Sequence, residues 1–219
     1  MKSVLTGVGI AAIGLLLGSA AQAASFTNGS FEDATNFTPN GDNTESLSAG
    51  STDMPGWTVT GAKIAWIGPT NPFGLVASDG DYFLDLTDYT SGNGNGVTQS
   101  FDTVVNGKYT VTFDLGGGPT VSLNASAGGP AQSFSGAALS TFTSWDSQSF
   151  SFIAGTTLTA LSFIGTSNVA NYIGLDNVKV AFNGVAAVTP IPASVFLFAS
   201  ALGGLGFAGW RRSKRSAAA

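Results

Sequence analysis

Four aspartates in one short stretch, Asp79, Asp81, Asp85 and Asp88, are the first candidates for chemistry. If this stretch is a strand, side chains two residues apart point to the same face, so three of the four share a face. Three carboxylates on one face can bind a divalent cation, but the spacing is not that of an EF-hand loop, which needs a glutamate at its twelfth position. The pattern favours the simpler alternative, a solvated strand face. The apolar residues of the opposite face would be Tyr82, Leu84 and Leu86.

Two missing residue types exclude several classes of enzyme. The chain contains no histidine and no cysteine. A Ser-His triad, thiol chemistry, disulfides and most zinc sites are therefore excluded. Two aspartates can still act as a glycosidase pair, yet nothing in the pattern singles out a pair. We expect no catalytic residues, and the alternative is an exported hydrolase or lyase that acts on polysaccharide.

Aromatic side chains are a second group that can serve binding, because their rings stack on sugars. Aromatic residues of a β-sandwich more often fill its core, and Trp57 after Pro55-Gly56 is expected to do so. Trp66 and Tyr89 lie nearer to loop-like stretches. These two are the candidate sugar-stacking residues.

The elements that position these residues are expected to be strands. Gly, Asn, Asp and Ser separate eight β-rich runs. Such punctuation predicts an all-β, antiparallel β-sandwich, and Asn106-Gly107 between two runs predicts a hairpin. The runs cover residues 56–67, 82–87, 97–103, 109–115, 120–125, 147–152, 158–164 and 172–182.

The first residues have the composition of a signal peptide. Lys2 provides a positive start, residues 4–17 are apolar, and Ala21-Gln22-Ala23 fits the small-residue cleavage pattern. Cleavage is expected after Ala23. Residues 1–23 are therefore interpreted as a signal peptide, followed by a sandwich domain at 24–185.

The last residues have three parts, a proline motif, an apolar segment and a basic tail. Residues 193–210 carry no charge, and about 18 residues at 1.5 Å each make a helix of roughly 27 Å, close to the thickness of a bilayer core. Arg211-Arg212-Ser213-Lys214-Arg215 follows, which the positive-inside rule keeps in the cytoplasm. The alternative, a buried helix of the core, does not suit an apolar segment that ends in this cluster. The proline motif is Pro190, Ile191, Pro192, Ala193 and Ser194.

The charge of the exported part excludes one class of partner. Between residues 24 and 189 the chain has three lysines and all thirteen of its acidic residues, a formal net charge of −10. A polyanion is repelled by such a surface, so nucleic acid is not an expected partner. Divalent cations are attracted to it.

The three-part C-terminus resembles the VPLPA variant of the PEP-CTERM sorting signals of Gram-negative bacteria, with Thr189 and Ile191 in place of the usual Val and Leu. This resemblance implies export across the inner membrane, transient anchoring by the helix at 193–210, and cleavage near the proline motif by an exosortase. It also implies a final place at the cell surface or in a secreted matrix of exopolysaccharide. Residues 186–219 are interpreted as this sorting signal.

The order of motifs in the middle resembles the galactose-binding-like jelly rolls, which include DUF642-type domains and carbohydrate-binding modules. The motifs are Asn28-Gly29-Ser30-Phe31-Glu32, Pro55-Gly56-Trp57, Asp79-Gly80-Asp81-Tyr82, Gln99-Ser100-Phe101, 109–115 and Gly174-Leu175-Asp176-Asn177. The resemblance implies a jelly-roll fold whose first and last strands lie side by side.

A structural Ca²⁺ between those two strands is what the same resemblance implies. Glu32 and Asp176 match the positions that supply carboxylates, and Asn28 and Ser30 stand where backbone carbonyls would add oxygen ligands. The alternative is a turn at Asn28-Gly29 and a capped strand end at Asp176. Together these features predict an exported, non-catalytic surface or matrix protein associated with carbohydrate, and the remaining alternative is a coat protein without a ligand.

Overall fold

The computed structural model describes residues 25–87, 93–136, 139–167 and 172–186, together with residues 198, 200 and 202. The chain divides into two compact units, Met1–Val185 and Ala186–Ala219. The predicted signal peptide with Ala21 and Ala23, and the proline motif at 190–194, lie outside the described residues. Of the predicted span at 193–210, only residues 198, 200 and 202 are described, and these are helical. Within the part of the chain that the structure describes, no helix has both the length and the apolar character to cross a membrane.

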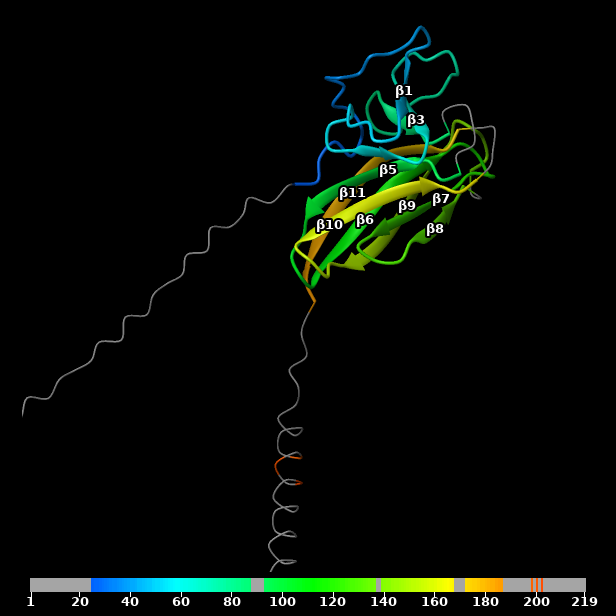
Figure 1. Ribbon diagram of the computed structural model, residues 1–219. Coiled ribbons are helices and arrows are strands. Elements are labelled where there is room, and N and C mark those ends of the chain that lie inside the picture. The colour runs from blue at the N-terminus through cyan, green and yellow to red at the C-terminus, as the bar shows by residue number, and fades with distance from the viewer. Residues whose placement is uncertain are drawn as a thin grey trace, which may run out of the picture. The chain divides into compact units, whose positions relative to one another are not determined.

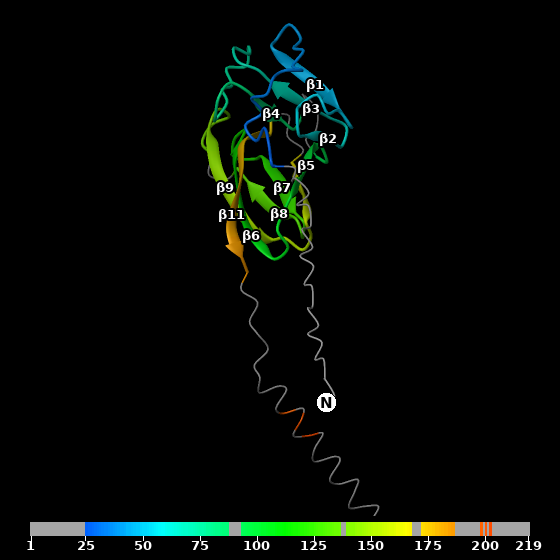
Figure 2. The same ribbon diagram turned by 90° about the vertical axis from the view of Figure 1, so that its left-hand side faces the viewer.

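Eleven strands of the first unit form two antiparallel sheets that face each other (Figure 1 and Figure 2). Sheet 1 has the order β1-β3-β4-β11-β6-β9, and sheet 2 has the order β2-β5-β10-β7-β8. The strands of sheet 1 are β1 Thr44–Ser48, β3 Lys63–Ile67, β4 Phe83–Asp85, β6 Gly107–Gly116, β9 Trp145–Ile153 and β11 Gly174–Val185. Those of sheet 2 are β2 Thr58–Thr60, β5 Gly96–Asp102, β7 Ser122–Ala127, β8 Gln132–Ser135 and β10 Leu158–Gly165.

The last eight strands have the connectivity of a jelly roll. The row β4-β11-β6-β9 faces the row β5-β10-β7-β8, so the chain crosses between sheets at most connections. The predicted jelly-roll sandwich is therefore confirmed. Strands β1 and β3 extend one edge of sheet 1, and β2 extends sheet 2.

Three local predictions were wrong because strand pairing depends on contacts that are distant in sequence. The run at 56–67 is two strands in different sheets, separated by Gly61, whose φ is +83°. Strands β1 and β8 were not predicted. Asn106-Gly107 does form a tight turn, with Asn106 at φ +61° and the Gly107 N–H bonded to the Val104 carbonyl at 2.7 Å. This turn joins sheet 2 to sheet 1 and makes no hairpin, since β5 pairs with β2 and β10.

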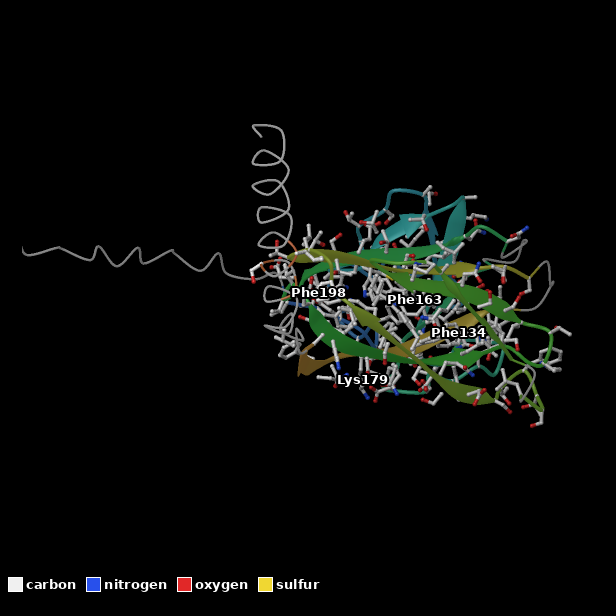
Figure 3. The ribbon with its side chains drawn as sticks, turned by 90° about the horizontal axis from the view of Figure 1, so that it is seen from below. Phe134, Phe163, Lys179 and Phe198 are labelled. Carbon is white, nitrogen blue, oxygen red and sulfur yellow. The ribbon has the colours of Figure 1, made fainter. Side chains whose placement is uncertain are left out.

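The core lies between the sheets and follows the two-residue alternation of the strands. On β6, Tyr109, Val111 and Phe113 are buried, and Lys108 points outward. Figure 3 shows Phe134 and Phe163 between the layers and Lys179 on the outside. The described core residues all lie between Phe26 and Val180, within the first unit.

The two ends of the sandwich differ in their connections. At the turn end, short turns at 103–106 and 154–157 pack together and β11 finishes (Figure 1). At the loop end, β6 finishes and β11 begins, and longer segments, including 68–82, connect the strands. The predicted metal residues belong to the loop end.

Candidate functional site

Glu32 and Asp176 hold one loop, residues 78–82, which leads into β4. Asp176 is the third residue of β11 and is fully buried. Its Oδ2 accepts the backbone N–H groups of Ser78 at 2.7 Å and Asp79 at 3.0 Å. Glu32 Oε1 accepts the N–H groups of Asp81 at 2.9 Å and Tyr82 at 2.8 Å. We call this arrangement the loop clasp.

A second buried aspartate lies directly across from Asp176. Asp114 on β6 is its cross-strand neighbour, and the Ser78 hydroxyl lies 2.8 Å from Asp114 Oδ2 and 3.1 Å from Asp176 Oδ2. The Asn177 amide also donates to Asp114 Oδ2, at 2.9 Å. Two facing carboxylates repel each other, and the hydrogen bonds from Ser78 and Asn177 offset this repulsion and the cost of burying the carboxylates.

Burial raises the pKa of Asp176 from 3.8 to about 6, and hydrogen bonds from Asp79, Asn177 and Ser78 oppose this rise. Desolvation dominates because a charged carboxylate loses its water inside the sandwich, while each N–H donor favours the charged form. Asp176 therefore changes its charge within the mildly acidic range.

The N-terminal segment lies beside β11, as predicted for the two ends of the domain. The Val178 N–H donates to the Gly29 carbonyl at 2.9 Å. A Cβ on Gly29 would stand 1.9 Å from the Val178 carbonyl oxygen, so only glycine fits. Ser30 donates its hydroxyl to Asp79 Oδ2 at 2.8 Å. The backbone carbonyl of Asn28 does not face Glu32 or Asp176, because it accepts the Trp57 indole N–H at 2.8 Å.

These residues do not fit a calcium ion as they stand. Asp176 Oδ2 faces three protein donors and Oδ1 accepts the Asn177 N–H at 2.6 Å, so its oxygens are directed at hydrogen atoms. Calcium needs six to eight oxygen ligands. Among the described residues, no group of three or more acidic, histidine or cysteine side chains is placed to hold a metal. The calcium site remains an untested implication of the family resemblance, whereas the contacts observed for the two carboxylates are those of the loop clasp and by themselves predict no bound ion.

The aspartates at 79, 81 and 85 do not share a face. Strand β4 spans only Phe83–Asp85, so Asp79 and Asp81 lie in the preceding loop with exposed or half-exposed side chains. Asp85 is buried and accepts the Thr87 hydroxyl at 2.8 Å and the Ile173 N–H at 3.1 Å. The predicted common face was wrong because the strand begins four residues after Asp79. Asp88 lies outside the described residues.

Trp66 offers no ring to a sugar, which corrects its assignment as a stacking residue. It is fully buried on β3, with its ring against Phe37 and Tyr82. A strand buries side chains on both faces when loops cover the outer face of its sheet. The sequence around Trp66 does not reveal such a covering loop. Trp57 is in the core, as predicted. Tyr89 lies outside the described residues.

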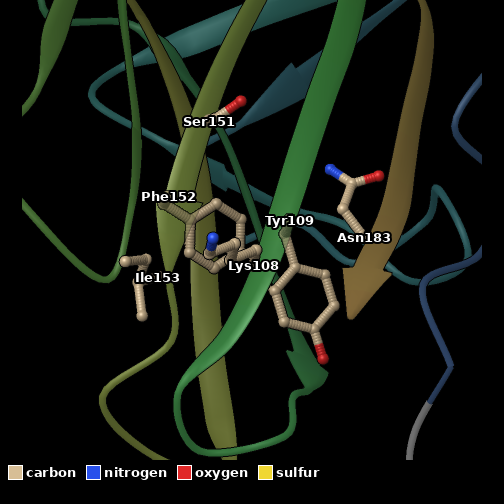
Figure 4. Close-up of a pocket in the computed structure, with 6 residues that line it drawn as sticks. All are labelled: Lys108, Tyr109, Ser151, Phe152, Ile153 and Asn183. Carbon is tan, nitrogen blue, oxygen red and sulfur yellow. The ribbon is translucent and has the colours of Figure 1, made fainter. Parts of the chain in front are cut away.

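A pocket of about 390 Å³ lies near the turn end, and the sequence reasoning missed it (Figure 4). Tyr109 and Phe152 line it with stacked rings, whose centroids are 5.1 Å apart at an angle of 12°. Its polar side chains come from three neighbouring strands and point outward. The lining residues are Lys108, Tyr109, Ser151, Phe152, Ile153 and Asn183.

Hydrogen bonds order the polar side of this pocket. The Asn183 amide donates to the Thr110 hydroxyl at 2.7 Å, and Thr110 and Ser151 hydroxyls are 3.1 Å apart. The Tyr109 hydroxyl accepts the Val104 N–H at 2.8 Å, which holds the ring in place. The outer face of the sheet thus presents an ammonium, an amide and a hydroxyl beside the apolar side chain of Ile153, whereas the Tyr109 and Phe152 rings point to the inner face. The Ser and Thr residues alternating along 108–112 and 147–151 were the available signal, although they indicate only an outer face.

Comparisons with known proteins give one matching family and several similar solved structures. The model of a family described as "Protein of unknown function (DUF642)" matches residues 24–180. No curated protein matches the chain. Among solved structures, a CBM35 from Cellvibrio japonicus Abf62 is 15% identical over 53% of this chain and 84% of its own, with a TM-score of 0.42. A CBM4 is 18% identical over 73% of this chain and 100% of its own, with a TM-score of 0.41. TmCBM61 in complex with β-1,4-galactotriose is 16% identical over 73% and 99%, with a TM-score of 0.43.

Proposed function

This chain belongs to the DUF642 family, and from that membership and its pocket we propose that its exported domain is a non-catalytic module that binds carbohydrate at the cell surface or in a secreted matrix. The proposal includes delivery by the C-terminal sorting signal and release by an exosortase. The pocket beside Tyr109 and Phe152 is the single observation that carries the binding role.

The chemistry of the pocket suits a sugar. The C–H faces of a pyranose ring pack on apolar side chains, and its hydroxyls pair with amide and ammonium groups. Lys108 and Asn183 supply these donors on the outer face of the sheet, and Ile153 and the methylene stem of Lys108 supply the apolar contact. A volume of about 390 Å³ lies within the range of ligand sites, which is roughly 300–1,000 Å³.

The same pocket supports a non-catalytic role. Glycoside hydrolysis needs a pair of carboxyl groups on either side of the bond. None of the six lining residues is acidic. The buried aspartates Asp85, Asp114 and Asp176 accept hydrogen bonds from within the protein.

Binding of residues 24–185 to a panel of exopolysaccharides tests this function. We expect saturable binding to at least one polymer, which Lys108→Ala weakens about tenfold, or roughly 1.4 kcal/mol. Lys179→Ala is the matched control, since Lys179 lies on the same outer face and does not line the pocket. Binding that survives in Lys108→Ala and Asn183→Ala would place the sugar elsewhere. No binding to any polymer would favour a coat protein, and shortened polymer chains would favour a hydrolase.

A further inference from the structure

Exposed apolar side chains gather at the turn end of the sandwich. Six large ones, each between 44% and 58% exposed, come from the turn at 103–106, from β9 and β10 where they meet the turn at 154–157, and from the end of β11. We call them the apolar rim. They are Val104, Val105, Ile153, Leu158, Phe182 and Val185.

Strand pairing places the six residues around one end of the sandwich, on both of its sheets. Ile153 pairs with Lys108, Val185 pairs with Gly107, and Leu158 pairs with Asp102, so all of them surround the same turn. The two turns are bonded to each other, through Asn106 N–H to the Ala154 carbonyl at 2.8 Å. Large apolar side chains that are exposed together at one end of a domain mark a contact with a partner or a membrane.

The charge of the domain lies away from the rim. Of the acidic residues that the structure describes, Asp102 alone belongs to the turn end, and Lys108 offsets it. The buried and exposed acids at 79–85, 114, 146 and 176 belong to the loop end. A domain with a formal charge of −10 therefore presents a neutral, apolar end. Such an end suits a lipid surface, since it avoids repulsion by anionic headgroups.

The chain itself brings this end to a membrane. Strand β11 ends in the rim at Val185, and the apolar segment predicted to span the bilayer begins at residue 193. The seven residues between them reach at most about 25 Å, at roughly 3.6 Å per residue. The 12 residues of β11 extend about 40 Å, at about 3.3 Å each. The tether therefore limits Val185 to about 25 Å from the bilayer surface, whereas the loop end can lie farther away by up to the length of β11.

We propose that, while the protein is anchored, the apolar rim rests on the outer surface of the lipid bilayer. This inference depends on the anchoring part of the proposed function. It assigns the turn end a role before release, when lipid covers the mouth of the pocket that shares Ile153 with the rim. Release of the domain then uncovers the pocket.

Single cysteines test the contact cleanly because the chain has none of its own. Leu158→Cys in the rim and Phe142→Cys at the loop end replace side chains of similar exposure, 55% and 51%. Each full-length variant is labelled with an NBD fluorophore. It is then reconstituted into phosphatidylethanolamine and phosphatidylglycerol vesicles that contain a headgroup-level nitroxide lipid. We expect several-fold stronger quenching at position 158 than at position 142.

The outcomes separate this proposal from the anchoring on which it depends. If the chain floats with vesicles after an alkaline wash but both probes are quenched equally, the rim contact is wrong and the anchor stands. If the chain does not float, both are wrong. The emission of the probe at position 158 can also shift to shorter wavelength without being quenched by the nitroxide lipid. If the protein is also a dimer, that result would assign the rim to a contact with a second copy. As a further check, Val105→Asp should reduce quenching at position 158 at least twofold and leave the thermal melt unchanged.

Discussion

Glu32 and Asp176 hold opposite ends of one loop, although they stand at the two ends of the domain sequence. The Glu32 carboxylate takes the N–H groups at 81 and 82, and the Asp176 carboxylate takes those at 78 and 79. Backbone N–H groups supply the positive partners for these two acids. The loop clasp therefore explains the placement of both residues without a metal.

Removing the buried half of the clasp is expected to destabilise the domain. Asp176→Asn replaces one acceptor oxygen by an amide and leaves buried N–H groups without a partner, which costs about 1–3 kcal/mol. In a domain of this size that lowers the Tm by roughly 2–4 °C for each kcal/mol. Thermal unfolding of residues 24–185 measures it. Asp81→Asn is the control, since the Asp81 side chain is exposed. Equal losses in the two variants would contradict the clasp.

The burial of Asp176 also predicts a pH dependence, which the hydrogen bonds of the clasp oppose without cancelling. The pKa of Asp176 is raised to about 6 in the folded protein, so the folded state binds a proton more tightly than the unfolded chain between pH 4 and 6. Stability from this group is complete below pH 4 and is lost as the pH rises through 6. Urea unfolding of the wild type and Asp176→Asn should therefore differ most at pH 4 and less at pH 7. A difference that grows with pH would refute the raised pKa.

The contact between the two ends of the domain is expected to tolerate no side chain at Gly29. Its Cβ would overlap the Val178 carbonyl, so Gly29→Ala should cost more than about 2 kcal/mol. A Cβ on Gly41 meets nothing within 4 Å, and Gly41→Ala should stay within about 0.5 kcal/mol of the wild type. Chemical denaturation of both variants measures this pair. Similar stabilities would show that the N-terminal segment does not hold its place beside β11.

Calcium is expected to leave the melting temperature unchanged, because the oxygens of Asp176 are directed at protein donors. Melts of residues 24–185 in excess Ca²⁺ and in chelator should coincide. A metal present at a hundredfold excess over its Kd would add about 2.7 kcal/mol and raise the Tm by several degrees. Such a rise, absent in Asp176→Asn, would restore the calcium site that the family resemblance implied.

Processing at both ends is a prediction that depends on sequence alone. The mature protein should begin at Ala24 and, in a host with an exosortase, lose the apolar segment and the basic tail. Mass spectrometry of the released protein measures both ends. A peptide that runs intact through Ser194 to Arg211 in that material would rule out the sorting signal.

Local patterns were sufficient for the class of fold, and they are the whole basis of the transport signals, which remain predictions. Alternation along strands such as β6 and β10 is a property of neighbouring residues, and it gave both strands to within two residues of their observed ends. Composition in the same way gave the charge of the domain and excluded chemistry that needs His or Cys. The order of short motifs then indicated the jelly roll.

Only the tertiary structure decided which side chains are buried, satisfied or free. Trp66 is hidden and Asp85 separates from Asp79 because strands distant in sequence and a covering loop determine what each side chain meets. The family resemblance placed the N-terminal segment beside β11, and the Val178 N–H does bond to the Gly29 carbonyl, but the partners of Glu32 and Asp176 are the N–H groups of a loop between them in the chain. The pocket and the apolar rim arise where three strands and two turns finish at one end. No single segment of the sequence carries that information, since it depends on the register between strands.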